Sequence, residues 1–65
     1  MQFSKKIYLT RMQLNMSQES LAKELGVSFA TVNRWENGKS EPNKLKQYAF
    51  EQFCIKNGIN FGDEE

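Results

Sequence analysis

The stretch SQESLAKELGVSFATVNRWENG, residues 17–38, carries the strongest structural signal in this sequence. Ser17 and Ser28 each stand just before a helical pattern, where a serine oxygen accepts a hydrogen bond from the free N–H groups of the first turn. Gly26 follows the first pattern at once, and glycine often ends helices because it adopts positive φ without strain. The stretch therefore predicts two short helices joined by a tight turn, which is the helix-turn-helix arrangement.

Apolar residues in these two helices recur on one side. The buried stripe of the first is predicted at Leu21, Ala22 and Leu25. In the second helix, predicted over 29–37, Val32 and Trp35 are three apart and face inward. Trp35 is therefore expected in the core rather than on the surface as a ring on which bases stack.

Two further helices complete the pattern. The first is predicted over 4–14, with Ser4 as its cap and Asn15 as a left-handed end. The last is predicted over about 43–56, with Pro42 in its first turn. Its inward face is predicted to carry Leu45, Tyr48, Ala49 and Phe53. Phe50 and Cys54 are predicted to widen this apolar face.

The domain organisation follows from these patterns. No segment alternates with period two, so we expect an all-α, four-helix domain over 1–58. Residues 59–65 are expected to form a tail, in which Ile59 and Phe61 can fold back on the core. The segment 62–65 is expected to be frayed.

Composition excludes several classes of function. The 65 residues include no His and one Cys, so a zinc site or a disulfide framework is excluded within one chain. We expect no metal, no cofactor and no enzymatic activity, because paired carboxylates beside a nucleophile and a Gly-rich phosphate loop are missing. Cys54 is interpreted as a small apolar filler. No signal peptide is recognisable and no apolar run approaches the roughly 20 residues of a membrane span, so we expect a cytoplasmic protein.

Charge is unevenly distributed. The net charge is only +1, but Asp63, Glu64 and Glu65 stand together at the end. Residues 1–62 contain nine basic and five acidic side chains, a net of +4. This modestly basic body is weak support for nucleic-acid binding.

The residues resemble a known family over about residues 4–58, the Cro and phage-repressor (XRE-type) helix-turn-helix domains. The stretches that carry the resemblance are Ser17-Gln18-Glu19, Leu21-Ala22, Leu25-Gly26-Val27-Ser28, Val32, Arg34-Trp35-Glu36-Asn37-Gly38-Lys39 and Pro42. The resemblance implies a bacterial or phage transcriptional regulator that binds double-stranded DNA sequence-specifically, with helix 29–37 in the major groove.

The resemblance also implies roles for individual residues. Base contacts are predicted at Phe29, Ala30, Asn33 and Arg34. Phosphate contacts are predicted at Gln18, which often bonds a neighbouring side chain as well, and at Ser28, Thr31, Asn37 and Lys39. Arg11 and Glu36 match the family's internal ion pair. A homodimer on half-sites about one helical turn apart is implied, but the family's fifth helix is cut short here, so dimerisation is expected to be weak or absent in this chain alone.

Physical chemistry supports some of these roles and leaves alternatives for others. Arg34 offers a fork that matches guanine O6 and N7. Phe29 and Ala30 can read only thymine methyl groups or shape, where some family members carry Gln. Phe29 could instead pack on the preceding helix, and Asn33 and Gln18 could be plain surface residues. Arg34 could be merely solvated, Lys44 and Lys46 could contact phosphate or solvent, and Arg11 and Glu36 could be two surface charges of little effect.

Two rival functions remain open at this stage. The fold could serve as a protein-interaction module, antitoxin-like or adaptor, with an exposed Phe29 in the contact. RNA binding is disfavoured because few stacking aromatics are exposed, Phe29 and Tyr8 at most. Binding that weakens steeply with salt and prefers a sequence would favour DNA over a protein partner.

Overall fold

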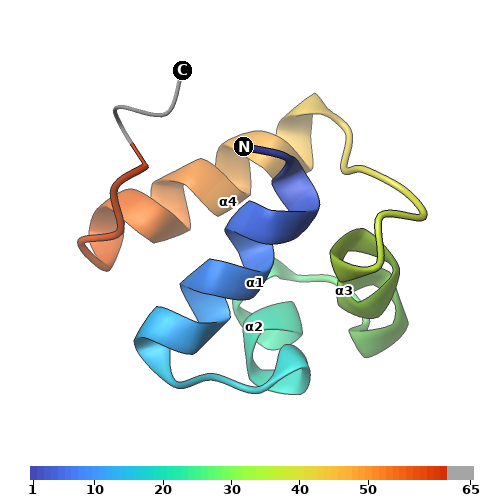
Figure 1. Ribbon diagram of the computed structural model, residues 1–65, viewed down its shortest axis with the longest axis horizontal. Coiled ribbons are helices and arrows are strands. Elements are labelled where there is room, and N and C mark those ends of the chain that lie inside the picture. The colour runs from blue at the N-terminus through green and yellow to red at the C-terminus, as the bar shows by residue number, and fades with distance from the viewer. Residues whose placement is uncertain (62–65) are drawn as a thin grey trace.

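The structure, a computed structural model, describes residues 1–61, which form four helices and no strand. In chain order these are α1 (Phe3–Leu14), α2 (Gln18–Leu25), α3 (Phe29–Glu36) and α4 (Lys44–Lys56). Helices α1 and α2 both pack against α3, and α4 packs against α2 (Figure 1). The predicted all-α, four-helix fold is confirmed.

The start of α1 differs from the prediction. The helix begins at Phe3, and its N-cap is Gln2, whose side chain forms no capping hydrogen bond. Ser4 lies inside the first turn, so its predicted role as a cap is wrong. The start depends instead on backbone bonds, because the Gln2 carbonyl accepts from the N–H groups of Lys5 and Lys6. Asn15 ends the helix at φ 57°, as predicted.

The central caps follow the serine pattern. Ser17 Oγ accepts from Ser20 N at 3.0 Å, and Ser28 Oγ accepts from Thr31 N at 3.1 Å. Gly26 ends α2 at φ 71°, a left-handed conformation that a side chain rarely adopts. The turn between α2 and α3 is therefore specified locally at both ends. Helix α3 ends at Glu36, one residue before its predicted end.

The core lies where the four helices meet. Its buried members are Ile7, Leu21, Ala22, Leu25, Val32, Trp35, Phe50, Cys54 and Ile59. Trp35 is only 4% exposed, which confirms its core assignment. The Phe3 ring packs edge-on against Trp35 and Phe50, with centroids 5.6 and 5.2 Å apart. Phe3 thus connects α3 to α4.

Helix α4 begins later than predicted. Asn43 is its N-cap and accepts from Lys46 N at 2.9 Å, so Pro42 lies before the cap and outside the first turn. The Lys46 ammonium reaches across to the Leu25 carbonyl at the end of α2, at 3.4 Å. This contact joins the beginning of α4 to the turn of the helix-turn-helix.

The predicted inward face of α4 is wrong for two of its residues. Leu45 is 72% exposed and Tyr48 is 61% exposed, whereas Phe50 and Cys54 are buried. Apolar residues occur all round this helix, so its sequence does not select one face. The packing of α4 against α2 and Phe3 selects the side that carries Phe50 and Cys54.

The segment after α4 returns to the core. Ile59 is buried and Phe61 packs against the core cluster, as expected. The expectation of fraying at 62–65 concerns residues outside the described part of the chain. No helix within residues 1–61 is long and apolar enough to cross a bilayer.

Candidate nucleic-acid interface

Helix α3 has a buried side and an exposed side. Val32 is fully buried and Trp35 nearly so, and both point into the core. Phe29, Ala30 and Arg34 are exposed on the other side of the helix. The Arg34 side chain forms no hydrogen bond or ion pair with any other residue of the described part, 1–61. Its five N–H donors are therefore available to an external acceptor.

Phe29 is 54% exposed at the first position of α3. It is not part of the core cluster or of the apolar residues packed against it. Phe29 is therefore largely exposed rather than buried against the preceding helix. A half-exposed aromatic ring beside Ala30 leaves a small apolar surface at the start of α3.

The polar residues at the two ends of α3 are also accessible. Ser28 is exposed, and its oxygen lies 2.9 Å from the Thr31 hydroxyl while it caps the helix. Asn37 and Lys39 are exposed just after the helix ends. These residues flank the exposed side of α3, where backbone N–H groups at the helix start can also bind an anion.

Arg11 and Glu36 form a two-pronged ion pair between α1 and the end of α3. Arg11 Nε lies 2.6 Å from Glu36 Oε2, and Arg11 Nη2 lies 2.7 Å from Glu36 Oε1. Arg11 Nη1 also donates to the Met16 carbonyl at 3.1 Å. Their side chains are only 12% and 7% exposed, so the pair is not a pair of loose surface charges.

The pair perturbs both partners. The hydrogen bonds to Glu36 raise the pKa of Arg11 despite its burial. Burial alone raises the pKa of Glu36, but the hydrogen bonds from Arg11 and Gln18 outweigh it and hold that pKa below its usual value. Glu36 is therefore a carboxylate at neutral pH.

A chain of side-chain amides starts at this carboxylate. Gln18 Nε2 donates to Glu36 Oε1 at 3.1 Å. Asn33 Nδ2 donates to Gln18 Oε1 at 3.2 Å, and Asn37 Nδ2 donates to Asn33 Oδ1 at 3.1 Å. The chain connects the beginning of α2 to the end of α3 and passes from half-buried to exposed positions.

Sequence reasoning found the members of this chain but not their connections. Gln18, Asn33 and Asn37 were each predicted to contact DNA, and Gln18 was expected to bond an unspecified neighbour. No pattern in the sequence pairs Gln18 with Asn33, because they lie on different helices. Their contact depends on the angle at which α2 crosses α3.

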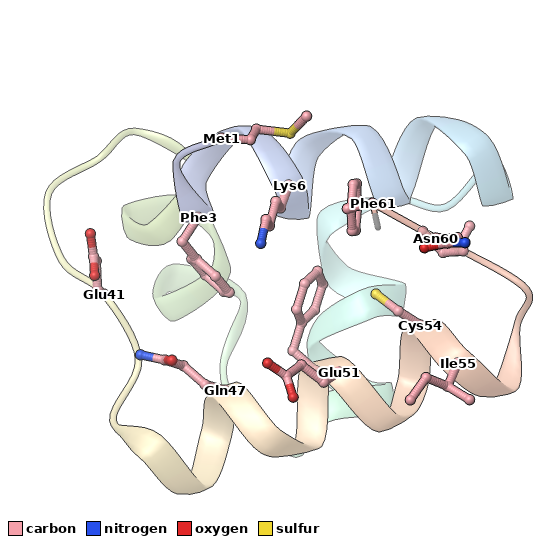
Figure 2. A pocket seen from close by; sticks show the side chains of 12 residues that line it. Met1, Phe3, Lys6, Glu41, Gln47, Glu51, Cys54, Ile55, Asn60 and Phe61 are labelled. Carbon is pink, nitrogen blue, oxygen red and sulfur yellow. The ribbon is translucent and has the colours of Figure 1, made fainter. Parts of the chain in front are cut away.

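A groove of about 560 Å³ lies elsewhere, between α1, α4 and residues 59–61. Phe3, Lys6 and Phe61 point toward it, and Cys54 lies on its α4 side (Figure 2). Burial raises the pKa of the Cys54 thiol. None of the predicted DNA-contacting residues lines this groove. Residues 1–61 contain no cluster of three His, Cys, Asp or Glu side chains that could hold a metal ion.

Comparison with known proteins gives matches over most of the chain. The sequence model of the helix-turn-helix family matches residues 7–48. The HTH-type transcriptional regulator DicA of Escherichia coli (strain K12) is 39% identical over 62 residues, covering 92% of this chain and 46% of DicA. The HTH-type transcriptional activator BcrR of Enterococcus faecalis is 42% identical over 43 residues, covering 66% of this chain and 21% of BcrR. The chain thus spans less than half of either relative, and no solved structure matches it.

Proposed function

The chain belongs to the XRE-type (Cro and phage-repressor) helix-turn-helix family, and from this premise we propose that it binds double-stranded DNA sequence-specifically as a bacterial or phage transcriptional regulator. Residues 1–58 would form the DNA-binding domain. Both curated relatives are transcriptional regulators by name, one of them an activator.

The observation that carries the proposal is the exposed Arg34 of α3, whose side chain has no hydrogen-bond or ion-pair partner among residues 1–61. Val32 and Trp35 fix the rotation of the helix by occupying the core, so the outward direction of Arg34 is set by packing. In the major groove its fork would bind guanine O6 and N7, a pair that discriminates by about 1–3 kcal/mol. Phe29 and Ala30 would contact thymine methyl groups, and Asn33 would lie beside them.

Residues around α3 would fix its register on the duplex. Phosphate contacts are proposed for five of them: Gln18, Ser28, Thr31, Asn37 and Lys39. Contacts of this kind position a protein on DNA but carry no sequence information. Their loss should therefore weaken binding to every duplex, and loss of the Lys39 charge should also lower the salt dependence.

A homodimer on two half-sites about one helical turn apart is the expected bound form. Selection from a randomised duplex pool, at two salt concentrations, tests both the function and the dimer. Enrichment of a roughly twofold-symmetric site supports a regulator that dimerises on DNA. Enrichment of a single half-site supports DNA binding by a monomer and contradicts the dimer.

Arg34→Ala is compared with Lys56→Ala in this selection. Both remove one positive charge from an exposed side chain. Lys56 is the last residue of α4, and the C-terminal end of α4 lies away from α3 (Figure 1). We expect Arg34→Ala to lose the preference for a defined sequence and Lys56→Ala to keep it. Absence of any enriched site, with binding that does not respond to salt, would refute the proposal and favour a protein-interaction module.

A further inference from the structure

We propose that the Glu36 carboxylate sets the hydrogen-bonding direction of Gln18, Asn33 and Asn37, so that these amides meet DNA as one oriented unit. The inference rests on the proposed function. It assigns Glu36 and Gln18 as positioning residues for DNA recognition, in addition to the structural role of Glu36 in the ion pair. The observation behind it is the unbroken chain of hydrogen bonds at 3.1, 3.2 and 3.1 Å.

Direction is the central point of the inference. An amide can present either its oxygen or its NH₂ group to a neighbour, so an isolated Gln or Asn has no fixed polarity. A carboxylate can only accept. Glu36 therefore requires the NH₂ group of Gln18, which leaves the Gln18 oxygen for Asn33.

The same logic continues outward. Asn33 must give its NH₂ group to Gln18, so its oxygen faces Asn37, which in turn donates. Arg11 holds the starting carboxylate by two short bonds, so the source of the polarity is itself fixed. The direction thus extends from a mostly buried ion pair to the exposed end of α3.

The arrangement decides what remains for DNA. After these bonds, Gln18 and Asn33 each keep one N–H donor. Donors suit the acceptors that DNA offers, which are phosphate oxygens on the backbone and N7 and O6 on purine edges. With the opposite direction, the oxygen and the NH₂ group of each amide would exchange places, so the spare N–H donors would lie at different positions. The chain also orders these side chains before binding, which lowers the entropy lost on association.

A double-mutant cycle on the selected duplex tests the coupling. Gln18→Ala and Asn33→Ala should each weaken DNA binding by about fivefold, the effect of one net hydrogen bond. If Asn33 depends on Gln18 for its orientation, the double variant should lose about fivefold to tenfold rather than the product of about 25-fold. The matched control is Gln52→Ala, an exposed amide on α4, whose effect should simply multiply with that of Asn33→Ala.

Direction is tested by a second pair of variants, studied where circular dichroism shows them folded. Glu36→Gln keeps the shape but replaces the acceptor with a group that can also donate. Arg11→Lys weakens the ion pair but leaves the acceptor in place. We expect Glu36→Gln to lose about fivefold in DNA affinity and Arg11→Lys to lose less.

The outcomes separate this inference from the proposed function. A wild-type chain that selects no duplex refutes the proposed function, and the inference falls with it. If the protein binds DNA but the losses of affinity in Gln18→Ala and Asn33→Ala multiply in the double variant, the proposed function stands and the coupling is refuted. Equal losses in Glu36→Gln and Arg11→Lys refute the role of direction. In NMR spectra of the free protein, Gln18→Ala should also shift the side-chain NH₂ resonances of Asn33 and Asn37. Unchanged resonances would contradict the series of hydrogen bonds that connects these amides.

Discussion

Truncating Glu36 to alanine should destabilise the domain more than any change on its surface. The substitution removes the acceptor of both short hydrogen bonds from Arg11 and of the bond from Gln18. The Arg11 guanidinium then remains mostly buried, with the Met16 carbonyl as its remaining acceptor. An uncompensated charge of this kind is the costly result of breaking a buried ion pair.

The magnitude follows from burial and geometry. Hydrogen bonds to charged groups contribute about 1.5–3 kcal/mol each, and removing one partner of a buried pair costs about 3–5 kcal/mol. Arg11 is 12% exposed, so it can regain some contact with water. We therefore expect a loss of about 3 kcal/mol, near the lower end of that range. A domain of 65 residues has a free energy of unfolding of only about 3–10 kcal/mol. The loss of about 3 kcal/mol should lower Tm by about 12–24 °C.

Urea unfolding monitored by fluorescence measures this loss, because the buried Trp35 is the only tryptophan. Glu24→Ala on the exposed surface of α2 is the matched control and should change stability by less than about 0.5 kcal/mol. Adding Arg11→Met to Glu36→Ala should recover about 1–2 kcal/mol, because the unpaired charge is removed. A loss below about 1 kcal/mol for Glu36→Ala would refute the reasoning and assign the pair the weight of a surface ion pair.

Three further predictions concern helix caps, the rotation of α4 about its axis, and pH. Ser28→Ala should lower the free energy of unfolding in urea by about 1 kcal/mol, because it removes the N-cap of α3. Ser4→Ala should lower it by less than about 0.5 kcal/mol, because Ser4 caps nothing, and equal losses would contradict this assignment. Phe50→Ala should cost about 3–5 kcal/mol and Leu45→Ala less than about 0.5 kcal/mol, and the reverse order would mean that α4 is rotated from the described orientation. Glu36 has a folded-state pKa below its ordinary value of 4.5, so its contribution is complete above that value and is lost as pH falls through the folded pKa. Wild type should therefore lose more stability than Glu36→Gln between about pH 6 and about pH 3, and parallel pH profiles would exclude this contribution.

Helix ends were predictable from the sequence where one side chain decides them. Ser17, Ser28 and Gly26 each act on backbone groups a few residues away, so their effect does not depend on the rest of the fold. The start of α1 was not predictable in this way. There the backbone carbonyl of Gln2 bonds the first turn, and any residue type can supply a carbonyl.

The orientation of α4 and the partners within the interface depend on tertiary packing. Leu45 and Phe50 are both apolar in sequence, and the packing of α4 against α2 and Phe3 places Phe50 inside. The exposure of Arg34, by contrast, followed from its position directly before the inward-facing Trp35. The exposed side of α3 was thus predictable from helical period, but the hydrogen bonds that connect Gln18, Asn33 and Asn37 were not.

Glu36 links the stability of the domain to the proposed DNA interface. The same carboxylate holds α1 through Arg11 and the beginning of α2 through Gln18, while standing at the last position of α3. A substitution at Glu36 must therefore change folding and the amide chain together. Gln18 offers a way to separate them, because Gln18→Ala leaves both Arg11 bonds to Glu36 in place. We expect Gln18→Ala to weaken DNA binding about fivefold while lowering the free energy of unfolding by no more than about 1 kcal/mol. A larger loss of stability with unchanged DNA affinity would mean that Gln18 serves the fold alone.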